Sequence, residues 1–237
     1  MHEPEPLHHI RLVPVVELPP YRFRKQPRTS PNGPRAELPE EGFRYWSDCL
    51  ADSGLHGLNP VQPGSWHVPT TEFRDADHLH IFLRITFQQW GGIDSLSSLE
   101  ESAVLDGGLA LFAEENEPLI EPTCCGDLAD AIEWKKAAKY EGPEWQMVWI
   151  GHPWISVRYE APWLILSAPH ETSPPSERWR VLPAALHQAW EEATNEQTRF
   201  AHKLAKALPT LGFRGDADDM GHRLAGLRPP EGESVSN

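Results

Sequence analysis

The sequence predicts an α+β fold, in which a mainly antiparallel sheet has a long C-terminal helix packed on it. Three short apolar runs, at residues 145–150, 154–159 and 163–166, are separated by turns that contain proline. Runs of this length at this spacing are typical of an antiparallel meander. From Pro183 to about Leu208, apolar residues recur at steps of mostly three or four, which predicts one long amphipathic helix. Such a helix has to bury its apolar stripe, and the sheet is the simplest surface to cover it.

The other elements follow from local periodicity and turn residues. In chain order they are a strand at residues 10–18 that Pro14 marks as edge or bulged, a Pro- and Arg-rich surface loop at about 19–41, a helix at 43–51, a strand at 79–90, a hairpin at 107–113 and 118–121, a helix from Asp127 or Asp130 to about 140, and a strand near 178–182. The strand at 79–90 rests on an alternation of apolar residues that begins at Leu79. We expect residues 1–208 to form a single α+β domain, and residues 209–237, which have few apolar side chains, to form a disordered tail.

The charge of the chain bears on its partners. The sequence has 21 Lys and Arg against 35 Asp and Glu, a formal net charge of −14. Because clustered basic residues are needed to bind phosphate backbones and anionic lipids, this charge argues against nucleic acid and against membrane surfaces. It is compatible with a basic protein partner, and also with simple solubility. No apolar stretch approaches the ~18 residues of a membrane span and no secretory signal is visible, so we expect a cytoplasmic location.

The cysteines predict no disulfide framework. The three residues, Cys49, Cys124 and Cys125, are odd in number and irregularly spaced, so reduced thiols in a reducing compartment are expected. A chain of 237 residues can bury enough surface to be stable without a disulfide or a metal. We therefore expect no cofactor and no structural metal, and the sequence assigns no oligomeric state.

The sharpest local feature is the segment Glu-Pro-Thr-Cys-Cys-Gly-Asp-Leu at residues 121–128. Cys124 or Cys125, near the start of a predicted helix, could be a thiolate nucleophile paired with His152. The same cysteines, with Asp127 and His152, are also acceptable zinc ligands. In a third interpretation the adjacent cysteines are small buried hydrophobes. The spacing does not decide among the three, because the chain has neither Cys-x-x-Cys nor His-x-x-x-His.

Tryptophan is plentiful, with ten residues, and four of them lie in the predicted meander. These four are Trp145, Trp149, Trp154 and Trp163. Aromatic residues in antiparallel strands commonly form the core and cross-strand pairs. Tryptophan is also enriched in binding surfaces, and strand alternation cannot turn all four inward. The four residues are therefore candidates for a recognition surface as well as for the core.

A family resemblance favours binding over catalysis. Residues 107–112, 119–122 and 127–134, with the predicted order of hairpin, short helix, further strands and C-terminal helix, resemble bacterial SUKH-type immunity proteins. In that family a small antiparallel sheet flanked by helices binds and neutralises a toxin domain. The resemblance leaves residues 1–70 unexplained and carries over no catalytic residue. It implies a bacterial binding protein rather than an enzyme.

The commonest enzyme motifs are also missing. The chain has no Gly-x-Gly-x-x-Gly, no phosphate-binding loop, no Gly-x-Ser-x-Gly and no His-Glu-x-x-His. The leading hypothesis is therefore a cytoplasmic, immunity-like protein-binding module. The alternative is a hydrolase or a zinc-binding protein that uses Cys124, Cys125, Asp127 and His152. A domain whose partner is its own copy remains a third possibility.

Overall fold

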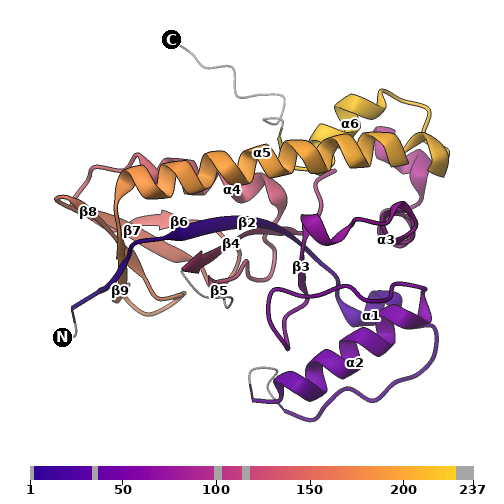
Figure 1. The fold of residues 1–237 in the computed structure, drawn as a ribbon, viewed down its shortest axis with the longest axis horizontal. Helices are drawn as coiled ribbons and strands as arrows, with labels where there is room; N and C mark the ends of the chain where they lie inside the picture. The colour runs from indigo at the N-terminus through magenta and orange to yellow at the C-terminus, as the bar shows by residue number, and fades with distance from the viewer. Residues whose placement is uncertain (1–2, 34–36, 99–102, 114–117, 228–237) are drawn as a thin grey trace. The chain divides into compact units, whose positions relative to one another are not determined.

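The computed structural model describes residues 3–33, 37–98, 103–113 and 118–227 (Figure 1). Contacts within the chain divide it into two compact units. Unit 1 contains Met1–Val15 and Asp106–Glu196, and unit 2 contains Val16–Leu105 and Gln197–Asn237. The single domain expected over residues 1–208 stays a prediction, because a division by contacts does not show whether the units fold independently.

Unit 1 is built on a five-stranded sheet that contains the predicted meander. In spatial order its strands are β1 (Glu5–Leu7), β9 (Glu177–Val181), β8 (Trp163–Ser167), β7 (Ile155–Glu160) and β6 (Gln146–Val148). β1 runs parallel to β9, and every other pair is antiparallel. The predicted meander and the strand near 178–182 are thus confirmed.

A second sheet has the order β3-β2-β4-β5. Its strands are β3 (His67–Pro69), β2 (Ile10–Glu17), β4 (Gly107–Ala113) and β5 (Pro118–Ile120). β4 and β5 are antiparallel, and Leu111 pairs with Ile120. The predicted strand at 10–18 and the predicted hairpin are both confirmed.

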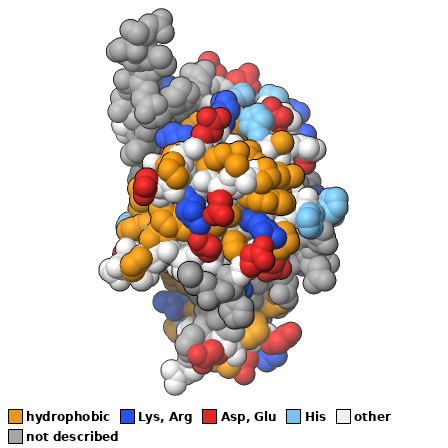
Figure 2. Space-filling view, turned by 90° about the vertical axis from the view of Figure 1, so that its left-hand side faces the viewer, with side chains coloured by type: hydrophobic (Ala, Val, Ile, Leu, Met, Phe, Trp, Pro, Cys, Tyr) orange, Lys and Arg blue, Asp and Glu red, His pale blue; other side chains and the backbone are white. Residues whose placement is uncertain are grey.

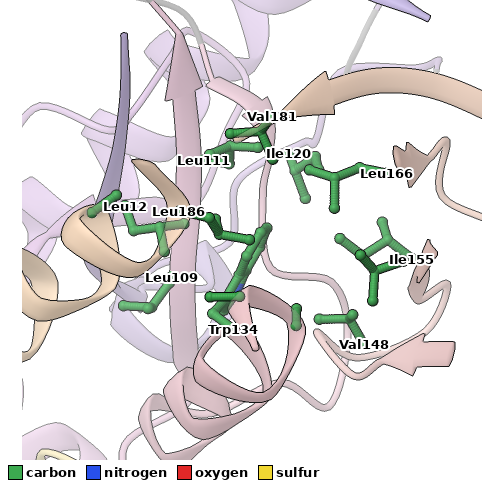
Figure 3. Packing of buried hydrophobic residues seen from close by; sticks show 14 of the residues in the cluster. Leu12, Leu109, Leu111, Ile120, Trp134, Val148, Ile155, Leu166, Val181 and Leu186 are labelled. Atoms are coloured by element: carbon green, nitrogen blue, oxygen red, sulfur yellow. The ribbon is translucent and has the colours of Figure 1, made fainter. Parts of the chain in front are cut away.

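The core of unit 1 lies between these strands and two helices. Side chains converge on Trp134 of α4 (Ala131–Ala138) from β2, β4, β5 and the five-stranded sheet, as Figure 3 shows. Leu186 brings in the first turns of α5 (Pro183–Ala207), whose apolar stripe continues through Ala189 and Ala193 in the same cluster. In Figure 1 this part of α5 lies along the strands and α4. The α+β fold with a long helix packed on a mainly antiparallel sheet is confirmed.

Unit 2 is mainly helical in its described residues. Its helices are α1 (Pro20–Phe23), α2 (Pro39–Asp52), α3 (Ala76–Gln89), α6 (Ala217–Leu224) and the end of α5, with short 3₁₀ turns at η1 (Thr70–Glu72), η2 (Ile93–Ser98) and η4 (Pro209–Leu211). Phe73 contacts Phe82 of α3 and Phe200 of α5, with ring centroids 5.1 and 6.0 Å apart. Among the described residues, none of the helices has both the length and the hydropathy that a bilayer crossing requires.

The strand predicted at residues 79–90 is wrong, because these residues belong to helix α3. Asp75 caps the helix: its carboxylate accepts the backbone N–H of Asp77 at 2.9 Å. The buried side chains follow helical spacing and are Leu79, Phe82, Leu83, Thr86 and Phe87. Most positions in this run are apolar, so periods of two and of 3.6 both fit it. The cap was the signal that should have decided for a helix.

The surface loop expected at about 19–41 is partly wrong. It contains α1, which buries Pro20 and Phe23, and α2 already begins at Pro39. In both helices a proline occupies the first turn, where its missing N–H leaves no hydrogen bond unmade. Prolines that suggested a loop therefore start two helices instead.

The disordered tail expected from residue 209 is wrong for the residues described there. Met220 and Leu224 of α6 are buried, and Asp216 caps this helix by accepting the N–H of Asp219. A Cβ at Gly221 would lie 2.6 Å from the Ala201 carbonyl oxygen, so the glycine permits close packing on α5. The low apolar content of this segment suggested disorder. Its few apolar residues nevertheless form a helix, because they occupy one helix face. Residues 228–237 lie outside the described residues.

Candidate metal centre

Cys124, Cys125 and His152 come together at the surface of unit 1, although they are distant in sequence. The two sulfur atoms and a ring nitrogen of His152 all lie within 4.8 Å of one another, and all three residues are exposed. Zinc binds sulfur at about 2.3 Å and imidazole nitrogen at about 2.0 Å, so two donors to one ion are at most about 4.6 Å apart. The observed spacing is close to that of donors that share an ion.

Backbone pairing between two loops creates this proximity. The His152 N–H donates to the Cys124 carbonyl oxygen at 2.9 Å, and the Thr123 N–H donates to the Ile150 carbonyl oxygen at 2.8 Å. The Thr123 hydroxyl also lies 3.0 Å from the Ile150 carbonyl oxygen and 2.8 Å from that of Pro153. The threonine therefore fixes the loop of the cysteines to the loop of the histidine.

Gly151 allows the two loops to approach. Its φ is +104°, a conformation that other residues rarely adopt. A Cβ at this position would overlap the Cys124 carbonyl oxygen and would lie 2.6 Å from the Thr123 hydroxyl oxygen. No side chain can therefore occupy position 151 without separating the loops.

Cys125 has an unusual backbone conformation. Among the described residues it is the one non-glycine residue with a positive φ, at +67°. It lies within a tight turn that is closed by the Gly126 N–H donating to the Thr123 carbonyl oxygen at 3.2 Å. Left-handed conformations cost a residue with a Cβ roughly 1–2 kcal/mol. Strain of this kind concentrates at functional sites, which makes Cys125 a stronger candidate than its sequence alone does.

Two indole rings orient the imidazole of His152. Its ring packs edge-on against Trp149, with centroids 4.6 Å apart, and against Trp154 at 5.7 Å. The two indoles are stacked, with an interplanar angle of 22°. Trp154 is held in turn by His170, whose N–H donates to the Trp154 carbonyl oxygen at 2.8 Å. His152 is thus exposed but constrained.

The thiol of Cys124 donates to the backbone carbonyl oxygen of His152 at 3.2 Å. A cysteine nucleophile needs instead a hydrogen bond to the ring of its histidine base, and a third group that orients the base. The contact to the carbonyl gives no such activation. The arrangement suits metal binding better than it suits nucleophilic catalysis.

Asp127 is not brought into the group of donors. Its carboxylate accepts the N–H of Ala129, and its own N–H donates to the carboxylate of Asp130, so the two residues form a capping box for the 3₁₀ turn η3 (Leu128–Asp130). Burial raises the pKa of Asp127, and it raises the pKa of Asp130 to about 7. The structure therefore assembles three of the four candidate residues and gives Asp127 a structural role at the start of the helical segment, as predicted.

The interpretation of the paired cysteines as buried hydrophobes is wrong. Cys124 and Cys125 are exposed, while Cys49 of α2 is fully buried. Burial raises the pKa of the Cys49 thiol, which keeps it protonated and inert. The three cysteines are thiols with no disulfide among them.

The four tryptophans of the meander are all half-buried, and none belongs to the core cluster of unit 1. Trp149 and Trp154 flank His152. Trp145 and Trp163 lie beneath arginine side chains: Arg158 stands 5.4 Å from the ring centroid of Trp145, and Arg180 stands 5.3 Å from that of Trp163. The core interpretation is therefore wrong for these residues, and their role in binding stays a prediction.

Sequence reasoning missed the residues that hold the centre together. Thr123 precedes the cysteine pair and Gly151 precedes His152, so both were visible in the sequence. Their contribution depends on pairing between the two loops, which no local pattern reveals.

Comparison with known proteins identifies no relative of this chain. No protein-family model matches the chain, and neither the curated proteins nor the solved structures provide a significant match. The resemblance to SUKH-type immunity proteins stays a prediction.

Proposed function

We propose that this protein binds a single soft metal ion through Cys124, Cys125 and His152. The observation that carries the proposal is the group of three donor atoms within 4.8 Å at an exposed position. Thiolate sulfur and imidazole nitrogen are the donors that zinc and copper(I) prefer among the protein side chains. The paired loops and the constrained ring of His152 support the proposal, because fixed donors lose little freedom when they bind an ion.

Titration of the reduced, metal-free protein with cobalt(II) and zinc(II) tests this function. We expect one ion per chain, with cobalt–thiolate absorption that disappears when zinc displaces the cobalt. The double variant Cys124→Ala/Cys125→Ala should bind neither ion. Cys49→Ala, which removes a buried thiol far from these donors in sequence, should bind as the unaltered protein does. Equal binding by the double variant and by the unaltered protein would refute the proposal.

Protein recognition by the arginine-bearing face of the five-stranded sheet is a second candidate function. Arg158, Ile165 and Arg180 are direct neighbours across β7, β8 and β9. The alternate residues of these strands, including Val157 and Leu164, belong to the core cluster, so this row lies on the other face of the sheet. There Ile165 is buried, and the side chains of Arg158 and Arg180 are 22% and 26% exposed. Figure 2 views the molecule from the side where Figure 1 places β8 and β9, and shows apolar side chains gathered among acidic and basic ones.

The tryptophans beneath this row give it the composition of a binding surface. Trp145 and Trp163 supply large apolar area, and Met147 of β6 is 46% exposed. Tryptophan, methionine and arginine are enriched at interfaces. The net charge of −14 of the whole chain favours the basic protein partner expected from the sequence.

Capture of basic proteins from a host lysate tests this second candidate. We expect a partner that is released by salt and is lost in the variant Trp145→Ala/Trp163→Ala. Tyr21→Ala, which removes an exposed aromatic ring from unit 2, is the control. A partner that the double variant captures equally well would exclude this face.

A further inference from the structure

We infer that the ion is copper(I), held in three-coordinate geometry by the sulfur atoms of Cys124 and Cys125 and a ring nitrogen of His152. This inference rests on the proposed metal-binding function and specifies its ligand. The number of donors, their chemical type and the surroundings of the imidazole support it.

The number of donors favours copper(I). Among the described residues, the group within 4.8 Å contains two cysteines, one histidine and no carboxylate. Zinc held by two cysteines and one histidine needs a fourth ligand, either another side chain or a water, whereas two soft thiolates and one imidazole suffice for copper(I). The carboxylates of Asp127 and Asp130, which follow the cysteines in the chain, already accept backbone N–H groups in the capping box. In the part of the chain that the structure describes, no fourth His, Cys, Asp or Glu joins the group within 4.8 Å to complete a zinc site made of protein ligands alone.

The surroundings of His152 also differ from those of a zinc ligand. A histidine that binds zinc generally donates its second ring N–H to a carboxylate or a carbonyl, which raises its basicity. Here the ring is oriented by edge-on contacts with Trp149 and Trp154. Aromatic faces stabilise a nearby cation and add no negative charge beyond that of the two thiolates. This environment suits a monovalent, soft ion.

The exposure of the donors indicates that the ion is exchanged. All three donor residues are exposed, so an incoming thiol ligand can approach an ion bound there. A closed four-ligand site would hinder such exchange. We therefore assign the centre to the reversible uptake and transfer of copper(I), with transfer occurring by ligand substitution and without a change of oxidation state.

Anaerobic titration and X-ray absorption spectroscopy test this inference. Copper(I) is added as its acetonitrile complex to the reduced full-length protein, against a bathocuproine competitor. We expect one copper per chain, coordinated by two sulfurs and one nitrogen. His152→Ala should lose the nitrogen and become two-coordinate, while His56→Ala, which alters an exposed histidine of unit 2, should keep it.

A second pair of variants tests the indole contribution. Trp154→Leu should weaken copper(I) binding by roughly 10-fold, as loss of an outer contact to a metal ligand typically does. Trp163→Leu, a tryptophan outside the His152 contacts, should leave the affinity unchanged. Circular dichroism of every variant confirms that a loss of binding is not a loss of fold.

The outcomes separate this inference from the proposed function. Copper bound by sulfur alone, several copper ions per chain, or zinc that one equivalent of copper(I) fails to displace would each overturn the copper(I) assignment while metal binding stands. Failure to bind copper, zinc or cobalt would overturn both.

Discussion

At the scale of single residues, the strained backbone of Cys125 predicts a trade between stability and binding. Cys125→Gly should stabilise the protein by up to about 1.6 kcal/mol, because roughly 1–2 kcal/mol of left-handed strain is relieved and roughly 0.4–1 kcal/mol is lost to the freer unfolded chain. The same variant should lose metal binding. Chemical denaturation measures the first effect, and cobalt titration the second.

Cys124→Gly is the matched control for this variant. Cys124 has no positive φ, so its replacement by glycine relieves no strain and should destabilise the protein. Changes of the same sign in both variants would show that the backbone of Cys125 stores no strain.

The pairing of Asp52 with Arg28 predicts how the free energy of unfolding falls in acid. The hydrogen bond from Arg28 lowers the pKa of Asp52 from 3.8 to about 2, and the Lys25 N–H donates to the same carboxylate at 3.3 Å. Because the folded pKa lies below the unfolded one, this stabilisation is complete above about pH 4 and is lost as the pH falls toward 2. Asp52→Asn should flatten the decline of the unfolding free energy over this range.

Asp48→Asn is the comparison for that measurement. Asp48 also faces Arg28, but at 3.5 Å and with a side chain that is 56% exposed. Its replacement should leave the acid dependence nearly unchanged. A variant at Asp48 that flattens the curve as much as Asp52→Asn would show that the close pairing with Arg28 is not the cause.

At the scale of elements, the pairing of the two loops predicts the effect of a single methyl group. In Gly151→Ala, the new Cβ overlaps the Cys124 carbonyl oxygen, which accepts the N–H of His152. We expect a loss of stability of at least about 1–3 kcal/mol and a large loss of metal affinity. Thermal denaturation and metal titration measure the two effects.

The variant Gly212→Ala shows how much of the effect of Gly151→Ala comes from backbone strain alone and how much from steric overlap. Gly212 has a φ of +98°, but a Cβ there meets nothing within 4 Å. This variant should lose stability through its backbone alone and should keep its metal affinity. If both variants keep the metal, close approach of the loops is not required for binding.

The helices and strands show which parts of the fold could be predicted from the sequence. The meander and the long helix were predictable because their periods are clear and their turns are marked by proline. The helix α3 was harder to predict, since its most apolar stretch fits both periods and the capping residue Asp75 was the signal that favoured a helix. The candidate residues were found by chemical type. The exposure of Cys124 and its contact with His152 could not be predicted, because both depend on pairing with a loop 28 positions away.

At the scale of the whole molecule, ion binding should stabilise the fold. The cysteines and the histidine are brought together only in the folded chain, so an ion that needs all three binds the native state. At a free-ion concentration one hundred times Kd the gain is about 2.7 kcal/mol. For a chain of this size we expect Tm to rise by roughly 5–10 °C. Calorimetry with and without the ion measures this shift.

The double variant Cys124→Ala/Cys125→Ala supplies the reference for that shift. It should melt at one temperature whether or not the ion is present. A rise in Tm of similar size in this variant would mean that the ion binds elsewhere.

The parallel pairing of β1 with β9 has a consequence for synthesis on the ribosome. Glu5 lies opposite Trp179, so the first strand cannot find its partner until the residues between them have been translated. At ~5–20 residues per second the nascent segment waits roughly 10–35 s. Throughout that interval Leu7, buried in the finished protein, is open to chaperones.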